Sequence, residues 1–325
     1  MSQINLLILE KNMTLIQLQY VLSVAEYKNF TIAAEKSFVT QPTLSMQIQK
    51  LEKELNTEIF DRTTHPITIT PIGEKIIIQG KKILKEAKKM HQMVLEEKNS
   101  LEGVIKIGII PTIFPSLVPL FYKTFKKNFP KTKLYILEMK THEIIQGFNE
   151  GTIDFGIGAT PLNEVRIIEK PIYEEPLVAF IPKFHQLYKE KKIKISLIKE
   201  KEVLLLAEGH CFRNNVLSIC NSSQTSSEGI QSGDFSTLIK LSKEGYGITI
   251  LPLLFEDNLS EEDKKSIRFF DEPKINPVRE VSLLYHENQI RLHFKEEFYK
   301  LIQGILRGIL YLESDKNNKP KIKLI

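Results

Sequence analysis

The spacing of apolar residues in this chain of 325 residues changes at Gly103. Between Met13 and about Ser100 they recur every three or four residues, which is the period of helices that bury one face. After Gly103, short apolar runs alternate with helical segments, as in "VIKIGIIP", "SLVPLFYKTFKKNFP" and "KLYILEM". Strands and helices that alternate at this spacing predict a parallel sheet with crossover helices. The chain is therefore expected to be an α/β protein with a helical part in front.

The composition excludes several classes of protein. Hydrophobic residues make up 42% of the chain, which is enough for a core in each of two or three folded units. The start, "MSQINLLILEKNM", has no small-residue cleavage site, and no apolar stretch is long enough to span a bilayer. A cytoplasmic protein with no membrane partner is expected. The net charge of +5 permits a polyanionic partner without requiring one.

The helical segments before residue 62 predict a helix-turn-helix. In "TLIQLQYVLSVAEYKN", the predicted inner face carries Leu15, Leu18, Leu22 and Ala25. After the break "VT", the segment "QPTLSMQIQKLEKELN" also shows one apolar stripe. Two short helices with a tight turn, the second bearing glutamines outside, match this motif. The alternating residues of "IFDRTTHPITIT" predict a hairpin that would form a wing.

Polar residues of the second helix are candidate contacts to DNA. Thr40 is a predicted N-cap, and Pro42 fits a first helical turn. An amide side chain can pair with the N6/N7 edge of adenine, and an ammonium group with guanine or phosphate. A solvated helix face is the alternative interpretation of the same pattern. The candidates are Thr40, Gln41, Pro42, Thr43, Ser45, Met46, Gln47, Lys50, Lys53 and Arg62.

A single long helix is predicted for residues 71–100. Its apolar residues repeat at intervals of 7, 4, 3 and 4, which is close to the seam of a coiled coil. A lone helix with such a stripe exposed would be unstable, so pairing with a second subunit is expected. The stripe consists of Ile76, Ile83, Ala87, Met90 and Val94.

Both cysteines of the chain lie in "GHCFRNNVLSIC", residues 209–220. In a reducing cytosol, such a pair is more often catalytic or redox-sensing than structural. If Cys211 to Cys220 formed a helix, the axial rise between them would be about 13–14 Å. A disulfide requires Cα atoms within roughly 4.4–6.8 Å, so the bridge could form only if the segment unwound.

The neighbours of Cys211 make it the better candidate for a reactive, nucleophilic thiol. Arg213 can stabilise a thiolate, and His210 can form a hydrogen bond or move a proton. Cys220 lies among apolar residues and is the candidate resolving thiol, which would condense with a sulfenic acid on Cys211. Two inert core cysteines are the alternative. The spacing lacks the paired motif of zinc sites, and neither a metal nor a cofactor is expected.

The segment "AAEKSFVTQPTLSMQIQKLEKELNTEIFDR" resembles the winged helix-turn-helix of LysR-type transcriptional regulators, and the resemblance extends from Met13 to about Leu310. It implies a linker helix that forms dimers and a periplasmic-binding-protein-like regulatory domain of two α/β lobes. "IGIIPT", "THEII", "EGYGITILP" and "PVREVSLLY", together with the cysteine pair, resemble the peroxide-sensing members of the family. The run specific to the family is Gln41, Pro42, Leu44, Ser45, Gln47, Ile48, Leu51 and Glu52.

The resemblance also implies site residues and partners. Thr112, Thr141 and Arg279 would surround the peroxide or position Cys211. Taken from the residues alone, the threonines could equally be helix caps, and the arginine could form a surface ion pair. The implied protein is an activator of the oxidative stress response and no enzyme. Its implied partners are promoter DNA, hydrogen peroxide, a second subunit in a dimer, further subunits in a tetramer, RNA polymerase and a cellular disulfide reductant.

The chain departs from the family pattern in three places. Asn56 stands where glycine is usual, and asparagine tolerates the left-handed conformation at a helix end. The wing sequence "TTHPIT" has few basic residues, which weakens the case for DNA backbone contacts there. Asn214 follows Arg213 where aspartate is common in the peroxide-sensing members, so the reactivity of the neighbouring thiol can be tuned differently.

The expected boundaries follow from these patterns and from the resemblance. Residues 1–12 are expected to be a disordered extension, 13–70 the winged helix-turn-helix, and 71–100 the linker helix. The regulatory domain is expected at 101–312, followed by a flexible tail at 313–325. Within that domain, lobe I is expected at about 101–175 and 279–312, and lobe II at about 176–278.

Two other functions fit the same patterns. A LysR-type regulator that binds a small carboxylate would use hydroxyls and helix N-termini in the cleft between the lobes. Its activity would not change in a Cys211→Ser variant. A thiol peroxidase would use a reactive cysteine in turnover with a reductant, but it would have no use for a DNA-binding unit. Common enzyme signatures such as the P-loop are absent from the sequence.

Overall fold

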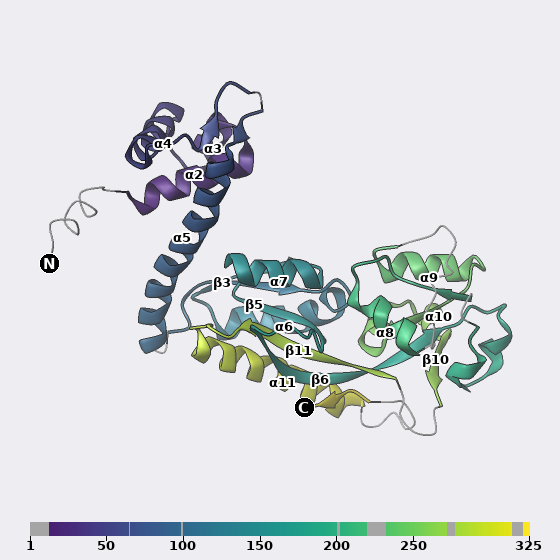
Figure 1. Ribbon diagram of the computed structural model, residues 1–325. Helices are drawn as coiled ribbons and strands as arrows, with labels where there is room; N and C mark the ends of the chain where they lie inside the picture. The colour runs from purple at the N-terminus through teal and green to yellow at the C-terminus, as the bar shows by residue number, and fades with distance from the viewer. Residues whose placement is uncertain are drawn as a thin grey trace. The chain divides into compact units, whose positions relative to one another are not determined.

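The computed structural model describes residues 13–64, 66–98, 100–199, 202–219, 232–271, 277–313 and 321–325. The chain divides into two compact units, Met1–Val94 and Leu95–Ile325, which are described separately below (Figure 1). The expected extension at 1–12 lies outside the described residues. Among the helices of the described ranges, none is long and apolar enough to cross a membrane.

The N-terminal unit is a winged helix-turn-helix, as the sequence predicted. Three helices pack around one core, to which Leu18, Val21, Leu44 and Ile48 contribute. An antiparallel pair of short strands forms the wing. The elements are α2 (Leu15–Tyr27), α3 (Phe30–Lys36), α4 (Gln41–Leu55), β1 (Phe60–Asp61), β2 (Thr68–Ile69) and the first part of α5 (Pro71–Glu97).

Local signals fix both ends of α4, the second helix of the motif. The Thr40 side chain accepts a hydrogen bond from the Thr43 N–H, and Pro42 occupies the first turn. The helix ends at Asn56, whose backbone is left-handed with φ of 50°. Asparagine is one of the few non-glycine residues that adopt this conformation readily. The departure from glycine at this position is therefore compatible with the fold.

The predicted inner face of α2 is wrong at its first position. Leu18 is buried as expected, but Leu15 is 46% exposed and Gln17 only 1% exposed. Gln17 is polar, yet its side chain is hydrogen-bonded at both ends, to the Thr14 N–H and to Gln47. A buried polar residue with partners is stable, and an apolar period cannot reveal it.

The helix α5 starts directly against the wing. The Thr70 hydroxyl accepts a hydrogen bond from the Gly73 N–H at 3.0 Å. A Cβ atom at position 73 would overlap the carbonyl oxygen of Ile59, so only glycine fits there without a shift. Further along α5, Met90 and Val94 of the predicted dimerisation stripe are exposed.

The strand β6 (Ile167–Phe180) belongs to two sheet segments in the C-terminal unit. Its first part pairs with β11 (Val278–His286), and its last residues pair with β9 (Ile248–Pro252) and β10 (Ile267–Phe270). The strand order through β6 is β4-β3-β5-β11-β6-β10-β7. The remaining strands of this path are β3 (Gly103–Ile109), β4 (Thr132–Glu138), β5 (Phe155–Thr160) and β7 (Lys192–Ile193).

The sheet is mixed, whereas the sequence predicted a parallel one. β3 is parallel to β4 and β5, but β11 is antiparallel to both β5 and β6. The first part of β6 escaped prediction because "IIEKPIYEE" contains charged residues and a proline, which disguise a strand. The α/β class with an N-terminal winged helix-turn-helix is nevertheless confirmed.

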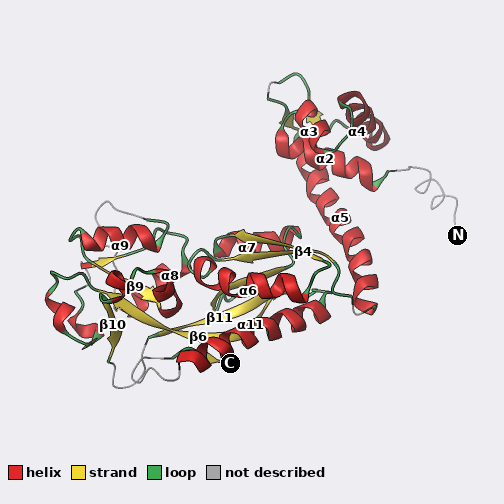
Figure 2. Ribbon diagram, turned by 180° about the vertical axis from the view of Figure 1, so that it is seen from behind, coloured by secondary structure: helices red, strands yellow, loops and turns green. Residues whose placement is uncertain are grey.

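Helices cover both faces of the sheet segment that consists of β4, β3, β5, β11 and the first part of β6 (Figures 1 and 2). On one face α6 (Phe114–Asn128) and α11 (Leu292–Glu313) pack through Phe125 and Phe298, whose ring centroids are 5.9 Å apart. On the other face α7 (Thr141–Glu150) packs Ile144 against the sheet at Gly156. The remaining elements are η1 (Gln186–Lys189), η2 (Ile195–Leu197), β8 (Val203–Leu204), α8 (Cys211–Ile219), α9 (Phe235–Lys243), η4 (Leu253–Asn258), α10 (Glu261–Lys264) and β12 (Lys323–Leu324).

The end of the chain differs from the expected flexible tail. β12 pairs with β6 in antiparallel fashion, with Leu324 opposite Tyr173. Ile322 is buried, and the Ile325 N–H donates a hydrogen bond to Ile172 O. The polar and lysine-rich composition hid this short strand. The rest of the expected tail, residues 314–320, lies outside the described residues.

Candidate functional site

Cys211 is the first residue of the helix α8. Its thiol is free and partly buried. The predicted helical segment is confirmed for Cys211–Ile219, whereas Cys220 lies outside the described residues. Backbone N–H groups of a first helical turn have no partner within the helix and carry partial positive charge. Cys211 therefore lies at the end of α8 that favours a negative charge.

His210 precedes Cys211 and is buried. Burial lowers the pKa of its imidazole, and the charge of Lys140 lowers it further. The imidazole is therefore mainly neutral at pH 7 and is a weaker base than an ordinary histidine. The ammonium group of Lys140 lies close by, 3.8 Å from where a Cβ atom on Gly209 would be. Lys140 was not among the predicted site residues, although it follows a strand end as directly as Thr141 does.

Arg213 is buried, and its guanidinium donates a hydrogen bond to Leu206 O at 2.9 Å. This bond ties α8 to the segment that follows β8. It also gives the guanidinium a backbone partner that the sequence could not reveal. The predicted contact between Arg213 and a thiolate at Cys211 stays a prediction.

A buried ion pair joins residues from several elements near α8. The Arg279 Nε donates to Glu175 Oε2 at 2.8 Å, and its Nη1 donates to the Thr112 hydroxyl at 3.0 Å. Both charged side chains are almost completely buried, at 1% and 0% exposure. The guanidinium also lies 5.3 Å from the ring centre of Phe212, the residue after Cys211. Two of the predicted site residues, Thr112 and Arg279, are thus in direct contact.

Glu175 is the part of this cluster that sequence reasoning missed. Its second oxygen accepts a hydrogen bond from the Leu254 N–H at 2.7 Å. Glu175 therefore connects β6, β11 and η4 through one carboxylate. A glutamate in the sequence "YEEPL" looks like any exposed charge, and only its distant partners identify it as buried.

Thr141 begins α7, and its hydroxyl oxygen is buried without a hydrogen-bond partner in the described part of the chain. It follows Lys140, whose charge acts on His210. A buried hydroxyl without a partner costs about 1–3 kcal/mol. A small polar molecule at this hydroxyl could recover part of that free energy.

The outer face of α4 carries most of the predicted DNA contacts. Thr40 precedes the helix, and Arg62 comes from the wing. Ser45 and Gln47 are partly buried, and each has a hydrogen-bond partner inside the unit. The exposed members are Thr40, Gln41, Pro42, Thr43, Met46, Lys50 and Lys53.

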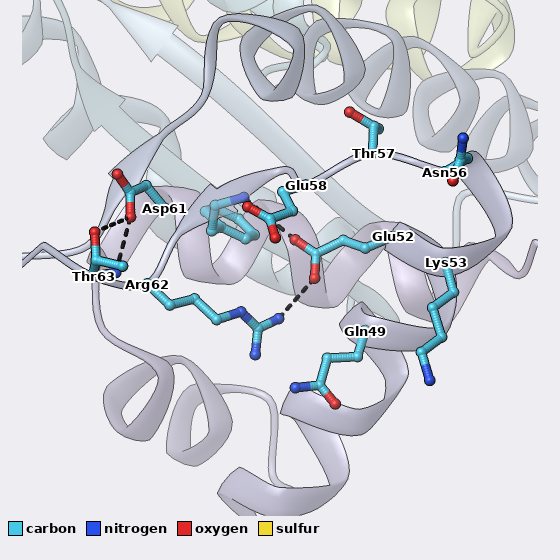
Figure 3. A pocket seen from close by; sticks show the side chains of 10 residues that line it. Gln49, Glu52, Lys53, Asn56, Thr57, Glu58, Asp61, Arg62 and Thr63 are labelled. Atoms are coloured by element: carbon cyan, nitrogen blue, oxygen red, sulfur yellow. Dashed lines mark hydrogen bonds and ion pairs between the residues drawn. The ribbon is translucent and has the colours of Figure 1, made fainter.

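Arg62 is engaged within the unit. Its guanidinium donates hydrogen bonds to Ser45 Oγ at 3.1 Å and Glu52 Oε2 at 2.8 Å, and lies 4.8 Å from the Phe30 ring centre. Glu52 also accepts from the Ile59 N–H at 2.9 Å. Figure 3 shows Glu52 and Arg62 in a polar hollow between α4 and the wing. Arg62 thus holds the wing to α4, whatever it contacts on DNA.

Removing the Glu52 carboxylate is expected to destabilise the N-terminal unit. A Glu52→Ala change leaves the buried Ile59 N–H without its acceptor and the Arg62 guanidinium without its carboxylate partner, at a cost of about 2–4 kcal/mol. Denaturant unfolding of the full chain, followed by circular dichroism, would measure it. Glu58→Ala removes the same charge from an exposed position and should stay within about 0.5 kcal/mol of the wild type. Equal effects of the two changes would contradict the expectation.

Family models match both units of the chain. Residues 15–74 match the bacterial regulatory helix-turn-helix of the lysR family, and residues 98–304 match the LysR substrate binding domain. The chain therefore belongs to the LysR family of transcriptional regulators. Within this family it groups with the OxyR-like, peroxide-inducible activators.

Individual relatives support this grouping. The chain is 31% identical to the hydrogen peroxide-inducible genes activator of Haemophilus influenzae, over 92% of this chain and 99% of the relative. It is 29% identical to the DNA-binding transcriptional dual regulator OxyR of Escherichia coli, over 91% and 97%. A full-length OxyR variant from Pseudomonas aeruginosa is similar in structure, with a TM-score of 0.70, 31% identity and coverage of 90% and 98%.

Proposed function

We propose that this protein is a DNA-binding transcriptional regulator that responds to hydrogen peroxide through Cys211. The observation that carries the proposal is the position of this thiol, which lies at the positive end of α8 beside a neutral, buried His210. A thiolate is the reactive form of cysteine, and a helix N-terminus favours it. The relatives named as peroxide-inducible activators support the same assignment.

The proposed reaction balances as two steps. The Cys211 thiolate attacks one oxygen of hydrogen peroxide, the O–O bond breaks, and a sulfenic acid and hydroxide form. The Cys220 thiol then condenses with the sulfenic acid, so that a disulfide and water form. Sulfur is oxidised by two electrons, and peroxide is reduced. The proton of the Cys211 thiol passes to water or to the neutral imidazole of His210, whose lowered pKa makes it a weaker base than an ordinary histidine.

We infer from the length of α8 that this helix unwinds before the second step. Cys211 and Ile219 begin and end this helix, whose length corresponds to a rise of about 12 Å between their Cα atoms. A residue bonded to Ile219 lies about 3.8 Å from it, so it comes no closer than about 8 Å to Cys211 while the helix is intact. A disulfide needs roughly 4.4–6.8 Å between Cα atoms. Forming the bridge therefore has to rebuild this segment.

The free energy for that rebuilding comes mainly from the redox reaction. Closing so short a loop changes the unfolded chain by only about 2–3 kcal/mol. Driving a two-state equilibrium from 1:99 to 99:1 takes about 5.5 kcal/mol. For a two-electron couple, about 30 mV corresponds to 1.4 kcal/mol, so a difference in potential of about 120 mV is sufficient.

The cluster at Arg279 connects the reacting segment to the rest of the unit. Unwinding α8 moves Phe212 away from the Arg279 guanidinium, whose other partners lie on β6 and before α6. We propose that the regulatory domains then rotate against each other in a dimer or tetramer, with the dimer formed through residues 71–97. The spacing of two DNA-binding units on two-fold-related promoter sites would change as a result.

DNA recognition is assigned to the outer face of α4. Lys50 and Lys53 are exposed and would supply salt-dependent affinity that is independent of base sequence. Gln41, Thr43 and Gln47 would read base edges in the major groove. RNA polymerase and a cellular disulfide reductant complete the proposed set of partners.

Peptide mapping of the oxidised protein tests the proposal directly. Purified full-length protein is treated with sub-millimolar peroxide, blocked, digested without reduction and analysed by mass spectrometry. We expect a peptide in which Cys211 is linked to Cys220, and its disappearance after treatment with a thiol reductant. Failure to find this bridge while Cys211 remains a free thiol would remove the peroxide-sensing function and leave the DNA-binding one.

A further inference from the structure

A relay of two hydrogen bonds connects the start of α2 to the DNA-facing residue Gln47. The Thr14 N–H donates to Gln17 Oε1 at 2.9 Å, and Gln17 Nε2 donates to Gln47 Oε1 at 3.2 Å. Gln17 is 1% exposed, so the relay runs through the interior of the unit. Gln47 itself is partly exposed on α4.

The direction of this relay follows from the chemistry of its first member. A backbone N–H can only donate, so Gln17 has to turn its oxygen toward Thr14. The Gln17 nitrogen then faces Gln47, and Gln47 has to present its oxygen in return. The capping box of α2 supports this orientation, because the Thr14 hydroxyl accepts from the Gln17 N–H at 3.2 Å. Neither amide can turn over without losing a hydrogen bond.

We propose that Gln47 reads DNA as a hydrogen-bond donor and thereby selects an acceptor edge, guanine before thymine. This inference rests on the proposed assignment of Gln47 to base readout. Its Oε1 is held by Gln17, and its Nε2 has no partner among the described residues of the unit. In the major groove guanine presents the two acceptors N7 and O6, and thymine presents the acceptor O4. Adenine presents the acceptor N7 beside the N6 donor, and a side chain that only donates leaves that donor without a partner.

The sequence alone favoured adenine for this residue type, because a free amide matches adenine with one donor and one acceptor. The anchored amide loses that match. Its oxygen points to Gln17, inside the unit, and is not presented together with the nitrogen. Gln17 is thus a positioning residue that determines the specificity of Gln47.

Replacing Gln17, the residue whose side chain holds the Gln47 oxygen, tests the inference. Full-length wild type and variants select sites from a randomised DNA library, and Gln47→Ala identifies the base pair that Gln47 reads. In the wild type we expect guanine to be the preferred base at that pair, with thymine as the second preference. A Gln17→Glu carboxylate only accepts, so it would bind the Gln47 nitrogen and turn the Gln47 oxygen toward the DNA. The preference should then change toward cytosine or adenine, on the order of tenfold.

Two further variants serve as controls. Gln17→Leu removes the hydrogen bond to Gln47 without replacing it. The base preference at the pair that Gln47 reads should therefore weaken, while the preferences at the other base pairs persist. Gln19→Glu makes the same charge change at an exposed position of α2 and should leave every base preference as in the wild type. Glutamate is a favourable third residue in a capping box, and circular dichroism would verify the fold of Gln17→Glu.

The outcomes separate this inference from the assignment on which it rests. If Gln47→Ala changes no base preference, Gln47 is no reader, and both statements fail. If Gln47→Ala removes a preference for adenine, the readout assignment stands and the donor-only inference is overturned. A folded Gln17→Glu variant with the wild-type preference also overturns it. The identity of the wild-type base decides the question even if Gln17→Glu does not fold.

Discussion

Replacing Cys211 with serine is expected to abolish the response to hydrogen peroxide. A serine hydroxyl has nearly the size of the thiol but is not oxidised by peroxide, so neither the sulfenic acid nor the disulfide can form. DNA binding without peroxide should persist, because Cys211 belongs to the C-terminal unit. Transcription from a target promoter with and without peroxide, in cells that carry either protein, measures the effect. We expect the peroxide-dependent change to disappear entirely.

Cys220→Ser is the matched control for this experiment. Its Cys211 should still be oxidised to a sulfenic acid, which dimedone labelling detects, but no intramolecular bridge should form. A Cys211→Ser variant that responds to peroxide like the wild type would rule out the thiol mechanism. A regulator that binds a small carboxylate would then be the better explanation.

Replacing Arg279 with methionine is expected to cause a large loss of stability. The change leaves the fully buried Glu175 carboxylate without its cationic partner and the Thr112 hydroxyl without its donor. Breaking a buried ion pair from one side costs about 3–5 kcal/mol. In a unit of this size, that loss lowers the melting temperature by roughly 10 °C. Thermal unfolding followed by circular dichroism measures the shift.

A double variant separates the charge from the packing. Arg279→Met combined with Glu175→Gln removes both charges, keeps an acceptor for the Leu254 N–H and should recover much of the stability, since no buried charge is then left without a partner. The control Arg166→Met removes an exposed arginine and should have little effect. If Arg279→Met is as mild as Arg166→Met, the ion pair does not stabilise the fold.

The sequence predicted the parts of the fold that depend on local signals. The apolar stripe of α4, its cap at Thr40 and its end at Asn56 all lie within one short segment. The helix that begins at Cys211 and the long helix from Pro71 were predicted for the same reason. In each case the residues that decide the structure are neighbours along the chain.

The features that could not be predicted depend on partners far away in the sequence. Glu175 pairs with Arg279, 104 residues later, and Gln17 bonds to Gln47, 30 residues later. Before folding, both look like ordinary exposed polar residues. The mixed sheet and β12 were not predicted for a similar reason, because charged residues and a proline lie in strands that long-range pairing stabilises. Lys140 acts on His210 only because folding brings α7 and α8 near each other.

The contact at Gly73 attaches α5 rigidly to the rest of the N-terminal unit. The backbone of α5 touches the Ile59 carbonyl there, and Thr70 holds the first turn through its hydroxyl. With no side chain between the two backbones, sliding or tilting at this joint meets an immediate steric barrier. A rotation of α5 would therefore turn the helix-turn-helix and its wing with it as one rigid body, because no flexible segment separates them at this contact.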